Sequence, residues 1–390
     1  MQRHVSMTLW SQAPAVAHSL PMLGWQNFAA TPLPPFSPVI REFIDVLSLR
    51  LQQAARLWPD LAALGFWLRR RQIEAQVHRM EGRLSLGVVF HLVPSNVPTV
   101  AFYSWLMALL MGNPSVVRLS SRDDEMQSAL LAILAELFAD PAWQDIASRT
   151  RFIRYGHEAH ITAWLSEQCS LRIVWGGDDT IRAIRAIALS PRAQELVFPD
   201  RRSMLLIDSR WLGEQKSEHV DRIATALTQD CTQFNQLACA SPTTLIWLGQ
   251  PEPVIRQALL ERIFAPLVAD PALAMERLVQ SQRSAAALPD SRMESLPGVT
   301  LLTLTAPQPL PFVGGGVLTE WAADNWEALL EKNWDMQTCV YVGGDLQQAR
   351  ARFGRCHGRV DRIVAPGQAL AFDWYWDGID LLQSCSRQMC

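Results

Sequence analysis

Two polar residues at the edges of apolar segments have the chemistry of a covalent catalyst. Cys239 comes just before the apolar, β-rich stretch from Thr243 to Leu248, and Asn96 follows another such stretch, from Leu86 to Val93. A side chain at the end of a buried strand is held rigidly at a cleft. A thiol beside an amide donor is sufficient for acyl transfer through a covalent thioester. The sequence therefore predicts Cys239 as a nucleophile and Asn96 as its oxyanion partner.

The composition indicates a folded protein with room for two cores. The chain has 390 residues, of which 49% are hydrophobic and 19% charged. Its formal net charge of −3 predicts no broad basic surface, so we expect no nucleic-acid partner. The most apolar span, Val97 to Met111, is too short to cross a bilayer comfortably and contains Pro98. We expect it to form a buried helix and expect no membrane span.

The remaining cysteines and one histidine favour plain structural roles. The seven cysteines include no CxxC pair and no Cys/His cluster with zinc spacing, so we expect no metal site. Their odd number, without an N-terminal secretory signal, predicts reduced thiols and a cytoplasmic location. Cys231 lies eight residues before Cys239 without the same context, and we expect it in the core. His91, inside an apolar strand, is also expected to be a hydrogen-bonded core residue rather than a base.

The hydrophobic pattern predicts an α/β protein. Residues 38–83 have helical periodicity, and residues 85–208 alternate strands with helices. The expected strands are 86–93, 116–119, 171–175 and 203–207, and the expected helices are 97–111, 128–138 and one from Ile181. Such alternation predicts a parallel, doubly wound sheet, whose ligands lie at the carboxyl ends of the strands.

Four regions follow from this pattern. Residues 1–84 are expected to form an N-terminal extension with helices, and residues 85–209 a cofactor-binding domain. Residues 210–345 would hold the nucleophilic cysteine. Residues 346–390 would complete the fold or form an oligomer contact. We expect a homo-oligomer.

Several ordered motifs resemble one known family. They include residues 87–98 (GVVFHLVPSNVP), the segment from Gly112 to Arg122, the segment around Cys239, and residues 361–378, which end in Trp-Asp-Gly. Together they resemble the LuxC family, the acyl-thioester reductases of bacterial bioluminescence, over most of the chain from about residue 38. That family is a branch of the aldehyde dehydrogenase superfamily. The resemblance implies an aldehyde dehydrogenase-like α/β fold with two doubly wound, Rossmann-type domains and a helical N-terminal segment.

The resemblance also implies roles for individual residues. Cys239 matches the superfamily's nucleophile, and Asn96 matches the asparagine that forms the oxyanion hole together with the cysteine N–H. Gly176 and Gly177 match the turn under the cofactor diphosphate. In the plain reading, a glycine pair is only a turn.

The cofactor choice depends on the run Arg118-Leu119-Ser120-Ser121-Arg122. In the resemblance, Arg118 stands where most aldehyde dehydrogenases have a lysine at the adenosine ribose. Ser121 stands where members that prefer NAD carry a glutamate. Without that carboxylate, and with Arg118 and Arg122 beside Ser120 and Ser121, the run favours NADPH.

One departure from the superfamily favours reduction over hydrolysis. Phe198 stands where hydrolytic members have a glutamate general base, so water is not activated against a Cys239 thioester. Glu195 lies near enough in sequence to substitute.

These inferences predict an NADPH-dependent reduction of an acyl thioester to an aldehyde through a Cys239 acyl-enzyme. The expected donor is a long-chain fatty acyl-CoA or an acyl-carrying protein such as an acyl-protein synthetase. One alternative is an acyltransferase or acyl-binding protein of the same fold that has lost reduction. Another is an acylating aldehyde dehydrogenase that works in the oxidative direction.

Overall fold

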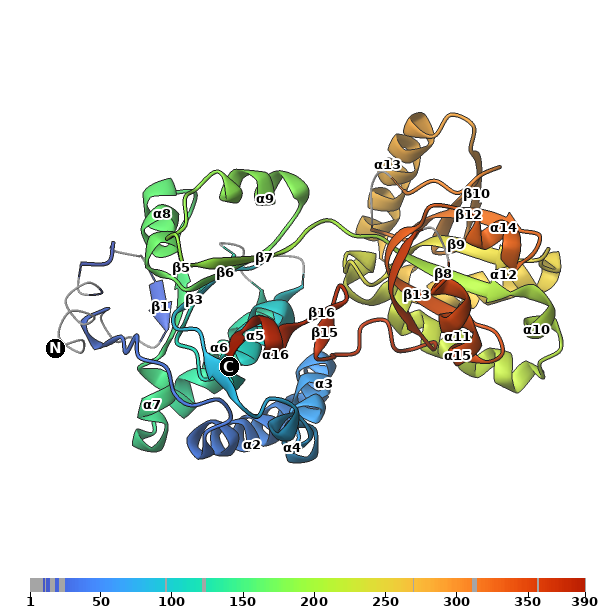
Figure 1. Cartoon of the computed structure of the whole chain (residues 1–390). Helices are drawn as coiled ribbons and strands as arrows, with labels where there is room; N and C mark the ends of the chain where they lie inside the picture. The colour runs from blue at the N-terminus through green and yellow to red at the C-terminus, as the bar shows by residue number, and fades with distance from the viewer. Residues whose placement is uncertain are drawn as a thin grey trace. The chain divides into compact units, whose positions relative to one another are not determined.

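The computed structural model of the 390-residue chain describes residues 10, 12–14, 18–20, 25–94, 97–120, 124–268, 270–310, 314–355 and 358–389. The chain folds into two units, which Figure 1 shows. Unit 1 consists of residues 1–200 and 372–390, and unit 2 of residues 201–371. The boundary that we expected after residue 209 therefore lies inside unit 2, and residues 346–390 are divided between the two units.

In the described part of unit 1, six strands form one sheet in the order β1-β5-β4-β3-β6-β7. The strands are β1 (His18–Leu20), β3 (Val89–Leu92), β4 (Ser115–Arg118), β5 (Thr150–Arg154), β6 (Leu171–Trp175) and β7 (Gln194–Phe198). All pairs are parallel except β1 with β5. β4 and β6 lie on either side of β3, so the strand order reverses there, as in dinucleotide-binding sheets. The predicted parallel, doubly wound sheet is confirmed.

Helices cover this sheet and build the expected helical N-terminal segment. They are α2 (Pro38–Gln53), α3 (Pro59–Trp67), α4 (Arg70–Arg79), α5 (Pro98–Leu110), α6 (Glu125–Ala139), α7 (Gln144–Ala147), α8 (Ala159–Gln168), α9 (Asp178–Arg185) and α16 (Leu381–Ser384). Residues 99–110 of α5 are all buried, which explains its uninterrupted apolar sequence and confirms the predicted buried helix. No helix in the described ranges is long and apolar enough to cross a membrane.

Unit 2 contains a second sheet, with the order β10-β11-β12-β9-β8-β13-β14 in its described residues. The strands are β8 (Ser203–Asp208), β9 (Pro242–Leu248), β10 (Arg292–Leu296), β11 (Val299–Thr303), β12 (Val317–Ala323), β13 (Asp335–Val342) and β14 (Arg359–Val364). Only β10 runs antiparallel to its neighbour. The helices are α10 (Ser209–Gly213), α11 (Ser217–Thr232), α12 (Pro253–Phe264), α13 (Pro271–Ala287), α14 (Trp326–Leu330) and α15 (Leu346–Phe353). All seven residues of β9 are buried, as expected for a central strand covered on both faces.

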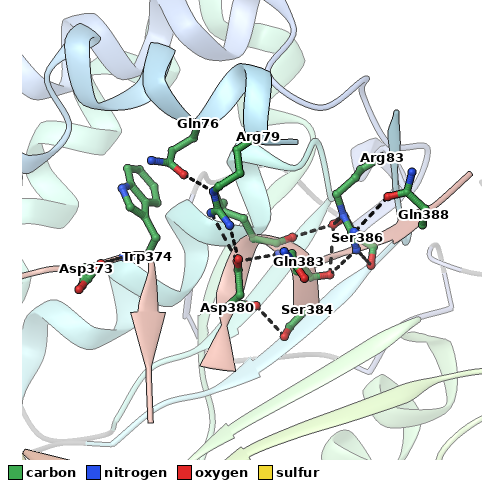
Figure 2. A network of polar contacts seen from close by, with 11 residues as sticks. Gln76, Arg79, Arg83, Asp373, Trp374, Asp380, Gln383, Ser384, Ser386 and Gln388 are labelled. Carbon is green, nitrogen blue, oxygen red and sulfur yellow. Dashed lines mark hydrogen bonds and ion pairs between the residues drawn. The ribbon is translucent and has the colours of Figure 1, made fainter. Parts of the chain in front are cut away.

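The C-terminal segment returns to unit 1 and is held there by the network in Figure 2. Strand β17 (Ser386–Gln388) pairs antiparallel with β2 (Arg83–Ser85). Arg79 forms an ion pair with Asp380, and Arg83 Nε donates to Ser386 Oγ at 2.6 Å (Figure 2). Asn113 donates to the Cys385 carbonyl at 2.7 Å. The last residues thus complete unit 1.

The Trp-Asp-Gly motif forms a hairpin turn in this segment. Strands β15 (Tyr375–Trp376) and β16 (Ile379–Asp380) pair antiparallel. Between them, Asp377 and Gly378 have φ angles of 50° and 72°. Both residues are in the left-handed region, as in the tight turns that match strand twist. The motif therefore serves as a tight turn between β15 and β16.

Candidate functional site

Cys239 stands apart from the other described cysteines in its exposure. Its side chain is half-buried, whereas Cys169, Cys231, Cys339 and Cys385 are buried. Burial raises the pKa of all four buried thiols, to about 12 for Cys169 and Cys385. Because the thiolate is the nucleophilic form, these four are inert. Of the described thiols, Cys239 is therefore the candidate nucleophile, and the expected core position of Cys231 is confirmed.

The chain approaches Cys239 through an unusual backbone segment. Phe234, Asn235 and Gln236 all have left-handed backbones, with φ angles of 52°, 55° and 63°. They lie in the short 3-10 helix η4 (Gln233–Gln236), which joins α11 to the cysteine loop. A non-glycine residue in this region costs of order 1–3 kcal/mol, so the surroundings must fix three such residues in a row.

Gln236 supplies much of that fixation. Its side chain is fully buried. The Nε2 group donates to the carbonyls of Pro242 at 2.8 Å and Val317 at 3.2 Å, and Oε1 accepts from the Gly316 N–H at 2.9 Å. One amide thus joins η4 to the starts of β9 and β12. The polar ends of the side chain are satisfied, as a buried amide requires.

The partner of Gln236 belongs to the glycine run 314–316, where no larger residue fits. All three glycines have positive φ angles: 110°, 67° and 86°. A Cβ on Gly316 would lie 2.3 Å from the Gly298 carbonyl oxygen, and one on Gly314 would lie 2.8 Å from Leu237 Cδ2. The Gly315 N–H donates to the Asn235 carbonyl at 3.0 Å. The run therefore acts as a backbone support for the cysteine loop.

A second contact holds the cysteine from the side of β8. Ser203 Oγ donates to the Cys239 carbonyl at 2.7 Å and accepts from the Thr338 N–H at 3.2 Å. Ser203 is fully buried. Through Ser203, the carbonyl of the candidate nucleophile is therefore fixed to the two neighbouring strands β8 and β13.

Three predicted site residues lie outside the described residues. They are Asn96, Ser121 and Arg122. Their roles stay predictions. Ser120, the neighbour of Ser121, is the second residue after β4 and is half-buried.

Arg118 ends strand β4 at the carboxyl edge of the unit 1 sheet. Its NH2 group donates to the Gly156 carbonyl at 2.9 Å, and its guanidinium lies 5.0 Å from the Tyr155 ring centroid. Burial raises the pKa of Tyr155, and the hydrogen bond to Thr162 and the charge of Arg118 oppose this shift. A half-buried cation is thus fixed at the edge where such sheets bind ligands.

Gly176 and Gly177 form the turn between β6 and α9, as predicted. A Cβ on Gly177 would lie 3.0 Å from Asp200 Oδ2, and one on Gly176 would lie 3.2 Å from Thr180 Cγ2. The Asp200 carboxylate accepts from the Asp178 N–H at 3.2 Å. The first turn of α9 is thus capped by the protein's own carboxylate, and a diphosphate at this turn would have to displace it.

Phe198, which we expected at the glutamate position of hydrolytic aldehyde dehydrogenases, has apolar surroundings. Phe198 is buried at the end of β7 and stacks on Trp175, with ring centroids 3.8 Å apart. Glu195 is held by two arginines: it accepts from Arg172 Nε at 2.9 Å and from Arg185 Nε at 3.0 Å. The carboxylate that we considered as a substitute base is therefore engaged in a structural ion network.

His91 is a core residue, as expected. It is fully buried, with Nδ1 2.8 Å from Ser104 Oγ and Nε2 3.4 Å from Ser115 Oγ. Burial lowers its pKa to about 3, so it stays neutral. Within the described residues, no group of three or more His, Cys, Asp or Glu side chains could hold a metal ion.

Two residues that position the cysteine were not predicted from the sequence. Gln236 stood in the cysteine motif, but its partner Gly316 is 80 residues away. Ser203 begins a predicted strand, and a serine there gives no local signal of its partner. Both contacts need the folded sheet, which brings the starts of β8, β9 and β12 together.

Known proteins resemble this chain in sequence. The model of the family described as Acyl-CoA reductase (LuxC) matches residues 62–255. The long-chain acyl-protein thioester reductase of Aliivibrio fischeri is 24% identical over 180 residues, which cover 45% of this chain and 35% of that protein. The protein of the same name from Vibrio harveyi is 26% identical over 66% of this chain and 48% of its own length. The chain thus spans about a third to a half of these relatives.

Solved structures resemble it in fold. The Mycobacterium tuberculosis aldehyde dehydrogenase complexed with NAD+ superimposes with a TM-score of 0.66, at 12% identity, over 91% of this chain and 85% of that one. The NAD-dependent aldehyde dehydrogenase from Sinorhizobium meliloti gives a TM-score of 0.64, at 15% identity, over 90% and 80%. The resemblance predicted from the motifs is therefore confirmed: residues 62–255 match the LuxC family of acyl-CoA reductases, on an aldehyde dehydrogenase fold.

Proposed function

We propose that this protein reduces an acyl thioester to an aldehyde, with Cys239 as the acyl-carrying nucleophile and NADPH as the reductant. The observation that carries the proposal is the placement of Cys239. It is the least buried of the described cysteines, its carbonyl accepts from Ser203, and the strained segment before it is fixed by Gln236. Strain maintained by buried polar contacts is typical of functional sites.

The first half-reaction transfers the acyl group to the enzyme. The Cys239 thiolate attacks the thioester carbonyl carbon and forms a new C–S bond. The oxyanion is stabilised by the Cys239 N–H and, as the family resemblance implies, by the Asn96 amide. The donor's C–S bond then breaks, and its thiol leaves with a proton.

The second half-reaction releases the aldehyde. When bound, the reduced nicotinamide supplies a hydride to the carbonyl carbon of the Cys239 thioester. The tetrahedral oxyanion then collapses, the C–S bond breaks, and the Cys239 sulfur recovers a proton. In total, one thioester, one hydride and one proton give one aldehyde and one free thiol.

The carboxyl edge of the unit 1 sheet supports a nicotinamide cofactor. Arg118 places a cation there beside the Tyr155 ring, a pair that suits a phosphate and an adenine. Arg118 and Ser120, with Ser121 and Arg122, are the proposed contacts to the adenosine and its 2′-phosphate. Gly176 and Gly177 are the proposed diphosphate turn.

The surroundings of Phe198 support reduction rather than hydrolysis. Its ring packs on Trp175, and Glu195 is engaged by Arg172 and Arg185. No general base for water is then available at these two positions, so the thioester would persist until it is reduced.

Measurement of NADPH oxidation, with dodecanoyl-CoA and a dodecanoyl-carrying protein as donors, tests the proposal. Aldehyde should form in a one-to-one ratio with NADPH consumed. Acylation of Cys239 without NADPH oxidation would instead indicate an acyltransferase.

A further inference from the structure

The end of unit 2 carries an arginine-lined pocket that the reaction above does not use. It is an open hollow of about 510 Å³ between α15 and the edge strand β14. Arg350, Arg359 and Arg362 line it, and Asp361 is the only acidic residue among the described residues of its wall. The chain as a whole has a net charge of −3, so this concentration of cations is local. Such a pocket is suited to an anion.

The single carboxylate does not cancel this charge. Asp361 Oδ2 accepts from Arg201 NH2 at 2.8 Å, and both side chains are 7% exposed. Asp361 also forms an ion pair with Arg359, so two guanidinium groups share one carboxylate and positive charge remains. The three lining guanidinium groups outweigh the carbonyl end of the short helix α15, which contributes about half a negative charge. Arg359 is 56% exposed, so a ligand from solvent can reach this guanidinium group on the side that does not face Asp361.

The pocket lies on the same edge of the sheet as Cys239. Ser203 Oγ bonds to the Cys239 carbonyl and to the Thr338 N–H, and Thr338 pairs with Arg362 across β13 and β14. These strands are parallel, so their starts share one edge. From β9 through β8 and β13 to β14 there are three strand spacings, or about 14 Å.

That separation matches the arm of a common acyl carrier. In 4′-phosphopantetheine about thirteen bonds join the thiol sulfur to the phosphate, equivalent to roughly four residues of extended chain, or about 15 Å. A thioester carbonyl at Cys239 would therefore bring the phosphate to the arginine pocket.

We propose that the pocket lined by Arg350, Arg359 and Arg362 binds the phosphate of a phosphopantetheine thioester while its acyl group reacts at Cys239. This inference rests on the proposed function, and it narrows the donor to carriers with that arm. Coenzyme A and phosphopantetheinylated carrier proteins share this phosphate, so both are candidate sources.

A binding experiment tests the pocket without any turnover. Calorimetric titration of the wild type compares pantetheine, 4′-phosphopantetheine and coenzyme A. We expect 4′-phosphopantetheine to bind at least tenfold more tightly than pantetheine, the effect of one or two charge-assisted contacts. Equal affinities would overturn the proposal. Equal binding of 4′-phosphopantetheine and coenzyme A favours the shared phosphate, whereas much tighter binding of a phosphopantetheinylated carrier protein favours that protein as the source.

Variants then assign the effect to the pocket. Arg359→Gln should weaken 4′-phosphopantetheine about tenfold. Gly354→Asp should do the same by adding a carboxylate at the pocket wall, where the nearest atom to a Cβ is 3.5 Å away. The matched control is Arg352→Gln on the same helix: this arginine lies over the Trp326 ring, not in the pocket, and its loss should leave binding unchanged. Equal effects of Arg352→Gln and Arg359→Gln would mean that the phosphate responds only to the general positive charge of this surface, and would overturn the proposed site.

Kinetics separate this proposal from the proposed function. Arg359→Gln should raise the KM for dodecanoyl-CoA about tenfold but leave kcat/KM unchanged for dodecanoyl-N-acetylcysteamine, which has no phosphate. A similar loss with both thioesters would overturn the phosphate site while reduction itself stands. Absence of reduction with every thioester would instead contradict the proposed function, and the titrations would still decide the pocket.

Discussion

The Gln236 side chain accepts a hydrogen bond from the Gly316 N–H at 2.9 Å, across 80 residues of sequence. The same amide donates to Pro242 and Val317, so a single residue joins the cysteine loop to two strands. This contact explains how three consecutive left-handed residues persist beside Cys239.

Gln236→Ala should therefore loosen the cysteine loop. It leaves a buried N–H and buried carbonyls without partners, which costs about 3 kcal/mol of unfolding free energy. Acylation of Cys239 by dodecanoyl-CoA should also slow. Urea unfolding and time-resolved intact-mass spectra measure the two effects. Gln229→Ala, at an exposed position of α11, is the control and should change neither. A stable, fully reactive Gln236→Ala protein would show that the loop needs no such clamp.

Cys239→Ser should abolish both the acyl adduct and NADPH oxidation. Cys231→Ser should keep most of both, because Cys231 is fully buried and its pKa is raised by that burial. Intact-mass spectra after incubation with acyl-CoA, without cofactor, report the adduct. An adduct that survives in Cys239→Ser and disappears in Cys231→Ser would reverse the assignment.

Asn96→Ala should lower kcat by about 10²–10³-fold, the usual effect of removing one oxyanion donor. Cofactor affinity should barely change. Steady-state rates with saturating NADPH test this expectation. A loss of less than a few-fold would leave Asn96 a turn residue beside Pro98.

Ser121→Glu should weaken NADPH binding far more than NADH binding. The new carboxylate would repel the 2′-phosphate, whereas it can accept hydrogen bonds from the free ribose hydroxyls of NADH. Arg118, fixed on the Gly156 carbonyl, is the cation that it would offset. Fluorescence titration of the wild type and of Ser121→Glu, each with NADPH and with NADH, gives the four dissociation constants. Equal weakening of the two cofactors would show that this segment does not contact the 2′ position.

Asp230 gives a prediction for pH. Its carboxylate is fully buried, and burial raises its pKa from 3.8 to about 6, although hydrogen bonds from the Gly367 and Ala369 N–H groups oppose the shift. Between these values the folded protein binds more protons than the unfolded chain. The stabilisation that Asp230 contributes is therefore fully present below about pH 4 and is lost as the pH rises to about 6. Over this range its contribution to the free energy of unfolding falls by about 3 kcal/mol in total.

Asp230→Asn should remove this dependence, because an amide carries no charge through the window. Urea unfolding of the wild type and variant at half-unit steps from pH 4 to pH 7 gives the difference. The exposed substitution Asp290→Asn is the control and should run parallel to the wild type. A difference between wild type and Asp230→Asn that stays constant with pH would contradict the raised pKa.

The sequence predicted the elements whose local pattern is strong. Residues 171–175 were predicted with the bounds that β6 has, since four of the five residues are apolar and Gly176 closes the run. The first strand was predicted from Leu86 but begins at Val89, because the Asn113 side chain accepts from the Leu86 and Gly87 N–H groups and draws them out of the sheet. An asparagine 26 residues away gives no sign of this contact.

Other elements had no clear pattern. β7 was not predicted as a strand, because it lies at the sheet edge with Gln194 exposed and Glu195 half-buried in an ion network. β5 was missed because Arg151 and Arg154 leave only two apolar residues between them, yet Arg151 is buried and donates to the Ala147 carbonyl at 3.0 Å. The site was predicted as far as Cys239 itself. Its supports, Gln236 and Ser203, depend on partners that only the folded sheet supplies.

The return of the C-terminal segment to unit 1 has a consequence for synthesis on the ribosome. Unit 2 is one continuous stretch and can fold as soon as it has emerged, whereas unit 1 needs both ends of the chain. Until Ser386–Gln388 arrives, β2 lacks the strand that pairs with it, and an unpaired edge is a site of misassociation. A nascent chain that has released residues 201–371 but not yet residues 372–390 would thus hold a finished second unit and an unfinished first.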